Sequence, residues 1–280
     1  EEPGQLKTEL QPMKSRTIIA RNQSPDVGFD RSINPYRGCS HGCIYCYARP
    51  NHAYLGLSPG LDFESKIFFK PHAGELLEKE LAKASYKPAT IHIGGDTDPY
   101  QPDEKQLRVT RAVIETLSRF RHPFSIITKS ALILRDLDVL SRMADRKLTR
   151  VAISITTLDR RLARSMEPRA ATPGKRIEAV RRLTEAGVPV TVMFAPCIPG
   201  LNDHEMEAVL ARAAEAGASA PDLPSPTHPA AAGPTVTVPT AASPAGAPGG
   251  PTVPPVPPQP VAPAYSSPGK APRHGPGWGA

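Results

Sequence analysis

The segment Thr90-Ile91-His92-Ile93-Gly94-Gly95-Asp96-Thr97-Asp98 carries the pattern that decides the fold. Its first four residues favour a strand, and the glycines and acidic residues that follow suit a strand exit. The same strand pattern recurs at Ser125–Thr128, Arg150–Ile155 and Val188–Phe194. Such nearly continuous hydrophobicity is typical of strands that are buried on both faces of a parallel sheet.

Amphipathic helices are expected between these strands. One covers Glu75–Ala84, and another starts at Asp103, with Gln106 at the capping-box position. A third begins at Thr172-Pro173 and ends before Gly187, and the last begins near Asn202 or Asp203 and ends before Gly217. The repeated strand–helix unit predicts a parallel α/β sheet with right-handed crossovers, either a barrel or a doubly wound sheet.

Polar or reactive residues lie at or after the end of each predicted strand, including a short first strand at Ser32-Ile33-Asn34. In order along the chain they are Cys39–Cys46, Gly94–Asp98, Thr128–Ser130, Ser154 and Pro196–Cys197. The carboxyl ends of parallel strands meet at one edge of the sheet, where functional groups collect. We therefore expect these residues to share one rim.

The first of these groups is Cys39-Ser40-His41-Gly42-Cys43-Ile44-Tyr45-Cys46, with C-x3-C-x2-C spacing. Three thiolates this close can bind three irons of a [4Fe–4S] cluster and leave the fourth iron open. The alternative is a zinc site completed by His41 or His52. Structural zinc sites usually combine two separated ligand pairs, and this sequence has no second pair. The spacing therefore favours a cluster on Cys39, Cys43 and Cys46.

This spacing, with aromatic Tyr45 before the last cysteine, resembles the radical S-adenosylmethionine (SAM) superfamily. Seven stretches between residues 14 and 218 resemble its spore photoproduct lyase group: Asn34–Cys39, Tyr45–Arg49, Asp96–Pro102, Ile127–Ser130, Ser154–Asp159, Glu167–Arg169 and Pro199–Asp203. The resemblance implies a partial (βα)6 TIM-like barrel with SAM at the rim. It also implies reductive cleavage of SAM to a 5′-deoxyadenosyl radical, which abstracts hydrogen from a substrate.

The resemblance implies roles for seven residues around SAM. Gly94, Gly95 and Asp96 would receive the SAM amino group, Thr97 the ribose, Lys129 and Ser154 the carboxylate and hydroxyls, and Tyr45 the adenine side. Structural alternatives stay open for three of them. Asp96 could simply form a turn, Lys129 could be a surface lysine, and Ser154 could bond to backbone.

The hydrogen donor is a separate question. Spore photoproduct lyase uses a cysteine near the end of its second barrel strand, where this sequence has Gly94-Gly95. Cys197 lies after the fifth predicted strand and is a candidate donor. The alternative is that Cys197 is a small buried residue, as free cysteines often are.

Composition changes abruptly near Ser219. About half of the 34 prolines follow it, in a segment too poor in apolar residues to fold. We expect an N-terminal extension at 1–29, a core domain at 30–218 and a disordered tail at 219–280. The barrel would then lack its last strand through a frame change or truncation, which would leave an open edge and weaken the fold.

Charge and cysteine usage suggest partners and compartment. The formal net charge is +7, and basic residues cluster at Arg160, Arg161, Arg164, Arg169, Lys175, Arg176, Arg181 and Arg182. They favour either a nucleic-acid surface or, more simply, a solvated helix face. Arg169 could meet an anionic substrate or form an ion pair. The four cysteines do not resemble a disulfide framework, and no apolar window spans a membrane, so a reducing cytoplasm is expected.

The expected function is therefore that of a radical SAM enzyme, lyase-like, with nucleic acid as the leading substrate class. A flavodoxin- or ferredoxin-type reductase would supply the electron. Three alternatives remain open: a zinc-stabilised nucleic-acid-binding module, an inactive remnant, and a radical enzyme that acts on a protein or a small molecule.

Overall fold

The structure is a computed structural model that describes residues 7–24 and 28–219. The chain divides into two units, Glu1–Pro239 and Thr240–Ala280, and every described residue belongs to the first. The predicted extension at 1–29 is therefore described only in part. Of the predicted tail at 219–280, only Ser219 lies within the described residues.

A six-stranded sheet, in the order β2-β3-β6-β7-β8-β9, forms the centre of the fold. Its strands are β2 (Ile19–Arg21), β3 (Arg31–Ile33), β6 (Ile91–Ile93), β7 (Phe124–Thr128), β8 (Thr149–Ser154) and β9 (Val190–Met193). All neighbours pair in parallel except β2, which is antiparallel to β3. Ile33 pairs with Ile93, and Ile93 with Ile126, so that a row of buried branched side chains crosses the sheet.

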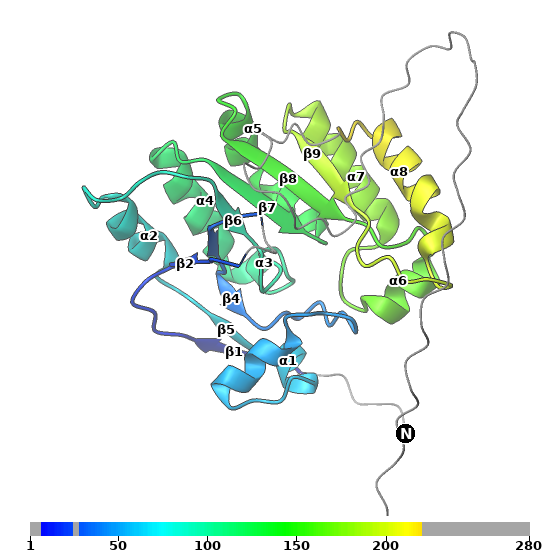
Figure 1. Ribbon diagram of the computed structural model, residues 1–280, viewed down its shortest axis with the longest axis horizontal. Coiled ribbons are helices and arrows are strands. Elements are labelled where there is room, and N and C mark those ends of the chain that lie inside the picture. The colour runs from blue at the N-terminus through cyan, green and yellow to red at the C-terminus, as the bar shows by residue number, and fades with distance from the viewer. Residues whose placement is uncertain (1–6, 25–27, 220–280) are drawn as a thin grey trace, which may run out of the picture. The chain divides into compact units, whose positions relative to one another are not determined.

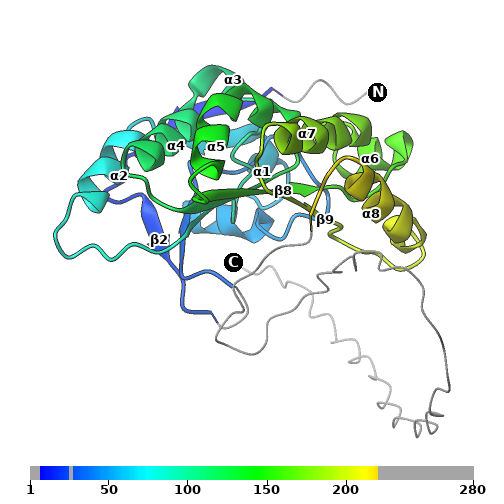
Figure 2. The same ribbon diagram turned by 90° about the horizontal axis from the view of Figure 1, so that it is seen from above.

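Helices cover one face of this sheet. α4 (Val109–Arg119), α5 (Leu137–Ala144) and α7 (Pro173–Glu185) lie side by side there, with α2 (Ala73–Leu81) and α8 (Met206–Glu215) flanking them (Figures 1 and 2). Each turns an apolar stripe inward. On α7 the buried residues Ala179, Val180 and Leu183 have the i, i+1, i+4 spacing of a single helix face.

A second, three-stranded sheet stands beside the first strand of the large one (Figure 1). Its order is β1 (Glu9–Pro12), β5 (Lys66–Phe69) and β4 (Tyr36–Arg37). Two short helices, η1 (Arg49–Leu55) and α1 (Leu61–Ser65), precede β5. This subdomain frames the segment that carries Cys39, Cys43 and Cys46, because that segment runs from β4 to η1.

The predicted fold class is confirmed: the five parallel strands occur in the expected order, and their ends lie within two residues of the predicted ones. One predicted helix is wrong. The helix expected from Asp103 is two helices, α3 (Glu104–Leu107) and α4, which a left-handed Arg108 (φ 53°) separates. The buried Glu104 carboxylate accepts from the N–H groups of Thr110 and Arg111 at 2.9 and 3.2 Å, and so caps α4.

β9 is an edge strand within the described part of the chain, and no strand follows it there. After α6 (Arg160–Met166), α7 and β9, the short η3 (Asp203–Glu205) leads into α8. The chain then returns to β9, where Ser219 donates its N–H to the carbonyl of Val190 at 3.0 Å. Within residues 7–24 and 28–219, no helix is long and apolar enough to cross a membrane.

Candidate functional site

The three clustered cysteines lie on one loop, residues 38–47, which we call the cysteine loop. All three are free; Cys39 and Cys43 are buried and Cys46 is half-buried. The loop is attached at both ends, because Cys39 donates its N–H to Phe63 O and Ile44 donates to Met166 O, each at 3.0 Å. Segments far apart in sequence therefore fix the spacing of the thiols.

The start of the loop is tied to the end of β6. Thr97 is buried, and its hydroxyl donates to the carbonyl of Gly38 at 2.6 Å. Gln101 accepts from the N–H of Ser40 at 2.8 Å and donates to Thr97 at 3.3 Å. Ser40 also donates its hydroxyl to Asp103 at 2.6 Å, so Asp103 serves the loop and does not cap α3. In this arrangement the Thr97 hydroxyl faces the cysteine loop.

Arg169 clamps the middle of the loop from the segment that follows α6. It donates its N–H to His41 O at 3.1 Å and its Nε to Ser40 O, and its Nη2 lies 2.5 Å from Glu64 Oε2. Of the two roles that the sequence left open for Arg169, the structure shows the ion pair. Gly42 has a φ of 69°, and a Cβ there would collide with Glu64 and Arg169.

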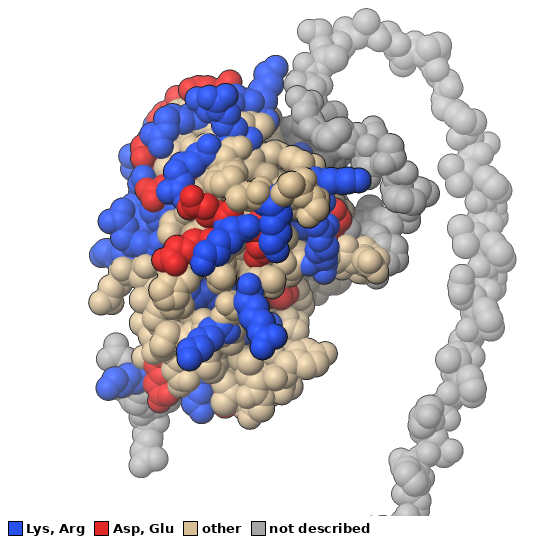
Figure 3. Space-filling view, turned by 90° about the vertical axis from the view of Figure 1, so that its left-hand side faces the viewer, with Lys and Arg blue, Asp and Glu red and all other residues tan. Residues whose placement is uncertain are grey.

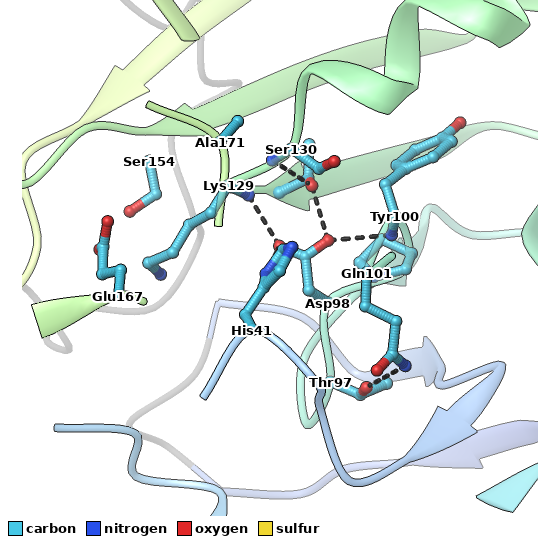
Figure 4. Close-up of polar contacts among 12 residues, drawn as sticks. His41, Thr97, Asp98, Tyr100, Gln101, Lys129, Ser130, Ser154, Glu167 and Ala171 are labelled. Atoms are coloured by element: carbon cyan, nitrogen blue, oxygen red, sulfur yellow. Dashed lines mark hydrogen bonds and ion pairs between the residues drawn. The ribbon is translucent and has the colours of Figure 1, made fainter. Parts of the chain in front are cut away.

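Asp98 connects the cysteine loop to the ends of β6 and β7 (Figure 4). Its carboxylate accepts from the N–H groups of Tyr100 at 2.9 Å and Lys129 at 2.7 Å, and from the Thr128 hydroxyl at 2.6 Å. Nδ1 of the buried His41 lies 3.4 Å from its Oδ2. Burial alone would raise the pKa of Asp98, but His41 and these hydrogen bonds lower it to about 2. Asp98 is therefore a fixed anion behind the thiols.

Glu167 and Arg176 form a buried ion pair on the other side of the loop. Glu167 also accepts from the hydroxyls of Tyr45 and, at 2.9 Å, Thr156. Arg176 donates to Ser154 O at 3.0 Å and to Ala171 O at 2.7 Å. Burial opposes the charge on Glu167, but Arg176 lowers its pKa below the usual value. Arg176 was expected on a solvated face, and that expectation is wrong.

Lys129 extends toward this pair from the end of β7 (Figure 4). Its Nζ lies 5.7 Å from the centre of the Tyr45 ring and makes no ion pair within the described residues. The neighbouring Ser154 is buried, and its hydroxyl donates to Ala195 O at 3.4 Å. Tyr45, Lys129 and Ser154 are thus brought together around Glu167, and Lys129 supplies a cation that an anionic group could meet.

The ends of β3 and β6 form a second group. Gly94 has a φ of 103°, and a Cβ there would lie 2.7 Å from Ile127 O, so the turn requires glycine. Gly95 accepts a hydrogen bond from the Tyr47 hydroxyl. Asp96 receives support from Asn34, whose Oδ1 accepts its N–H at 2.9 Å. Gly94, Gly95 and Asp96 therefore place polar backbone or side-chain groups at the ends of β3 and β6.

Cys197 stands apart from the clustered cysteines in sequence, after the end of β9. It is a free, half-buried thiol. Because β9 is parallel to β8, its carboxyl end lies at the same edge of the sheet as Ser154, with which Met193 pairs. The role of hydrogen donor stays a prediction for this residue.

The donor set of the cysteine loop, three free thiols, is of the kind that a [4Fe–4S] cubane takes. Among the described residues, no three His, Cys, Asp or Glu side chains converge on a point that could hold one ion. In a cubane each of three thiolates would bind a different iron. Burial raises the pKa of Cys43 to about 12 and that of Cys39 above its usual range, and a bound metal would favour the thiolate form of either residue.

Sequence reasoning placed Asp98 at the rim but missed its contacts with the cysteine loop, and it missed the roles of Gln101, Glu167 and Arg176. Arg176 left a signal, because it shares the apolar stripe of α7 with Ala179, Val180 and Leu183. A charged residue on such a stripe predicts a buried partner. Glu167 had no comparable signal, since its surroundings come from three separate segments.

A family profile and two known proteins are similar in sequence to this chain. The sequence profile described as the radical SAM superfamily matches residues 33–213. An uncharacterized protein of Mycobacterium tuberculosis (strain ATCC 25618 / H37Rv) is 36% identical over 205 residues, which are 71% of this chain and 60% of the relative. An uncharacterized protein of Methanocaldococcus jannaschii is 29% identical over 199 residues, 71% of each chain. The chain therefore spans about 60% of the length of its mycobacterial relative.

Among solved structures, a mutant spore photoproduct lyase with bound AdoMet and dinucleoside spore photoproduct is similar in fold. The TM-score is 0.53 at 19% sequence identity, over 74% of this chain and 57% of that one. At this identity the likeness concerns the fold alone. It agrees with the parallel sheet described above.

Proposed function

The chain belongs to the radical SAM superfamily, and from this premise we propose that it binds a [4Fe–4S] cluster on Cys39, Cys43 and Cys46 and cleaves SAM reductively. The observation that carries the proposal is the set of three free thiols on one clamped loop at the rim of the parallel sheet. When bound, the cluster and SAM would supply a one-electron cleavage that generates a hydrogen-abstracting radical.

The protein's own residues would position SAM. Lys129 offers a cation for the SAM carboxylate, next to the ring of Tyr45. Gly94, Gly95 and Asp96 offer carbonyls and a carboxylate to the amino group, and the Tyr47 hydroxyl would leave the Gly95 carbonyl when SAM arrives. Ser154 offers a hydroxyl whose present bond is long, at 3.4 Å. Thr97 would contribute by fixing Gly38 more than by touching the ribose.

For the substrate we propose nucleic acid. The formal net charge of +7 supports it, and so do two cations at the strand ends. Arg37 is exposed, and Lys70 lies beside it with its Nζ donating to Asn34 O at 2.7 Å. Burial and the Arg37 charge lower the pKa of Lys70 to about 8, so it is mostly charged at neutral pH. The similar lyase structure contains a dinucleoside.

The cluster is tested by anaerobic reconstitution with iron and sulfide, followed by elemental analysis. Wild type should bind about four irons and four sulfides per chain. Cys39→Ala, Cys43→Ala and Cys46→Ala should each lose most of this iron. Cys197→Ala is the matched control and should retain it. Stoichiometric zinc with no labile sulfide would contradict the proposal.

The substrate class is tested by the affinity for single- and double-stranded oligonucleotides over a range of salt. Arg37→Glu should weaken binding and reduce the slope of log K against log salt by about one. Lys79→Glu, on the exposed side of α2, is the control that changes the net charge equally. Equal binding by wild type and both variants would contradict a nucleic-acid substrate at this rim.

A further inference from the structure

One arginine of the central sheet has no partner. Arg150 is the second residue of β8 and is half-buried. Within residues 7–24 and 28–219 it makes no hydrogen bond and no ion pair. Apart from Lys129, every other lysine or arginine that is buried or half-buried in this part of the chain is held by at least one such contact. Arg31 and Arg176 are examples.

An unpaired cation means little where water surrounds it. On the face that carries α2, Figure 3 shows many exposed Lys and Arg side chains among Asp and Glu. Arg146, just before β8, is exposed and also lacks a partner among the described residues. Water solvates such charges, whereas a half-buried guanidinium loses part of its hydration and needs a partner to replace it. Arg150 therefore differs from the unpaired cations of the surface.

The alternation of burial along β8 places Arg150 on the face of the sheet that is opposite α5 and α7. Val151 and Ile153 are buried in the core that these helices cover, whereas Arg150 and Ala152 are half-buried. Successive side chains of a strand point to opposite faces, so Ser154 shares the face of Arg150. Ser154 lies four residues further along β8, or about 13 Å. Arg150 is therefore on the same face as the rim site, at the far end of the strand.

Two polar residues continue from Arg150 across the neighbouring strands. Arg150 pairs with Ser125 of β7, and Ser125 pairs with His92 of β6. Nδ1 of His92 lies 3.0 Å from Oγ of Ser125, and Phe29 stacks on the imidazole with ring centres 4.5 Å apart. Because neighbouring strands are about 4.8 Å apart, the three residues span about 10 Å. We call His92, Ser125 and Arg150 the Arg150 row.

The His92–Ser125 pair has a hydrogen-bond donor to spare. Burial and the charge of Arg150 lower the pKa of His92 to about 4, so the imidazole is neutral at neutral pH. The pair then carries two polar hydrogens and uses one of them between Nδ1 and Oγ. If Ser125 donates, Nε2 of His92 keeps its hydrogen; if His92 donates, the hydroxyl hydrogen is free. Either tautomer leaves one donor for an oxygen atom of a ligand.

We propose that the Arg150 row binds a phosphate group, with Arg150 supplying the charge and the His92–Ser125 pair a further donor. The planar guanidinium offers several N–H groups in a fixed geometry that matches phosphate oxygens. The choice of phosphate rests on the proposed nucleic-acid substrate, whose backbone would supply the group, and a small phosphate compound offers the same chemistry. A ligand held by its phosphate at Arg150 would extend along the sheet face toward Ser154 and the rim.

The experiment measures the affinity of the reconstituted full chain for inorganic phosphate and for two single-stranded tetranucleotides. One tetranucleotide has phosphodiester linkages, and the other has methylphosphonate linkages, which remove the backbone charge. The test variant is Arg150→Gln, and Arg150→Lys keeps the charge without the planar fork. Arg146→Gln is the matched control, because it also lowers the formal net charge of +7 by one.

Arg150→Gln should weaken the binding of the phosphodiester tetranucleotide by about 10-fold or more, Arg150→Lys by less, and Arg146→Gln by less than about 2-fold. The methylphosphonate should bind weakly, and equally to all of these proteins. Denaturant unfolding separates binding from a structural role. Because Arg150 has no partner to lose, Arg150→Gln should unfold at the same denaturant concentration as wild type. A lower midpoint would show a structural partner and overturn the inference.

The two sources of phosphate give different results. If Arg150→Gln weakens the binding of inorganic phosphate and wild type binds no tetranucleotide, the site stands for a small phosphate compound and the proposed nucleic-acid substrate is rejected. If Arg150→Gln and wild type bind both phosphate probes with equal affinity, the site is overturned. In that case a loss of tetranucleotide binding in Arg37→Glu would still support the proposed substrate, so the two failures are distinguishable.

Discussion

The sheet and the cysteine loop are stabilised by different forces, although they share one rim. The sheet is stabilised by a row of buried branched side chains, such as Ile33, Ile93 and Ile126. Each of them packs against other apolar groups of similar chemistry. The loop is positioned by buried polar contacts that are specific in direction, among them those of Gln101 and Glu167. Apolar burial tolerates small changes of shape, whereas a polar contact is lost entirely when one partner is removed.

The difference indicates where the protein is sensitive. A mutation in the sheet should lower stability without moving the thiols. A mutation in the polar contacts should lower stability and should also disturb the geometry that a cluster needs. Iron binding and the free energy of unfolding are therefore two separate readouts, and the following predictions use both.

The largest effect is expected at the buried ion pair. Arg176→Ala leaves Glu167 without its partner and should lower the free energy of unfolding by about 3–5 kcal/mol. It should also reduce the iron bound after reconstitution, because Glu167 contacts Tyr45. Denaturant unfolding and iron analysis measure the two effects. The double variant Glu167→Gln/Arg176→Met should recover part of the stability; no recovery would mean that the charge pair is not the cause.

Gly42→Ala should have the next largest effect. The left-handed φ of 69° and the contact with Glu64 and Arg169 should together cost about 1–3 kcal/mol. The loop should also open, which increases the rate at which a thiol reagent modifies Cys39 and Cys43 in cluster-free protein. Gly174→Ala, where a Cβ meets nothing within 4 Å, is the control and should leave that rate unchanged. Equal rates in the two variants would contradict the tight fit at Gly42.

Gln101→Met should remove the acceptor of the Ser40 N–H at similar volume. The loss of this buried bond should cost about 1–2 kcal/mol and lower iron binding. Gln101→Glu keeps an acceptor for Ser40, loses the longer bond to Thr97 and adds a buried carboxyl group. Because it keeps the bond to Ser40, it should bind more iron than Gln101→Met. The reverse order would show that the bond to Ser40 does not position the loop.

The smallest effect tests the other half of the comparison. Ile126→Val removes one buried methylene-sized group from the centre of β7 and should cost about 0.5–1.5 kcal/mol. Iron binding and thiol accessibility should stay at the wild-type values. A clear loss of iron in this variant would mean that the sheet and the loop are coupled, and that their separation is wrong.

Much of the sheet was predictable because strand burial leaves a local pattern. Hydrophobic runs predict the five parallel strands and their order. Thr172-Pro173 predicts the start of α7, and Gly187 predicts its end. The break at Arg108 was not predictable in this way. It depends on Glu104, whose carboxylate reaches forward to cap α4, and a capping box at Asp103 looked equally good in the sequence.

The site was predictable as a list of residues and less so as a set of contacts. The spacing of Cys39, Cys43 and Cys46 is local, so the sequence contains it directly. The partners of the loop are not local: Gln101 lies 61 residues from Ser40, and Arg169 lies 129 residues from it. Contacts of this kind depend on the packed fold and leave no periodic signal.

The most direct test of the central claim is 5′-deoxyadenosine formation by the reconstituted full chain, with SAM and dithionite under anaerobic conditions. We predict that wild type and Cys197→Ala release 5′-deoxyadenosine and that Cys43→Ala, assayed at equal protein concentration, does not. Release that is equal in Cys43→Ala and wild type, or no release from a wild-type chain that has bound its full iron, would contradict the account.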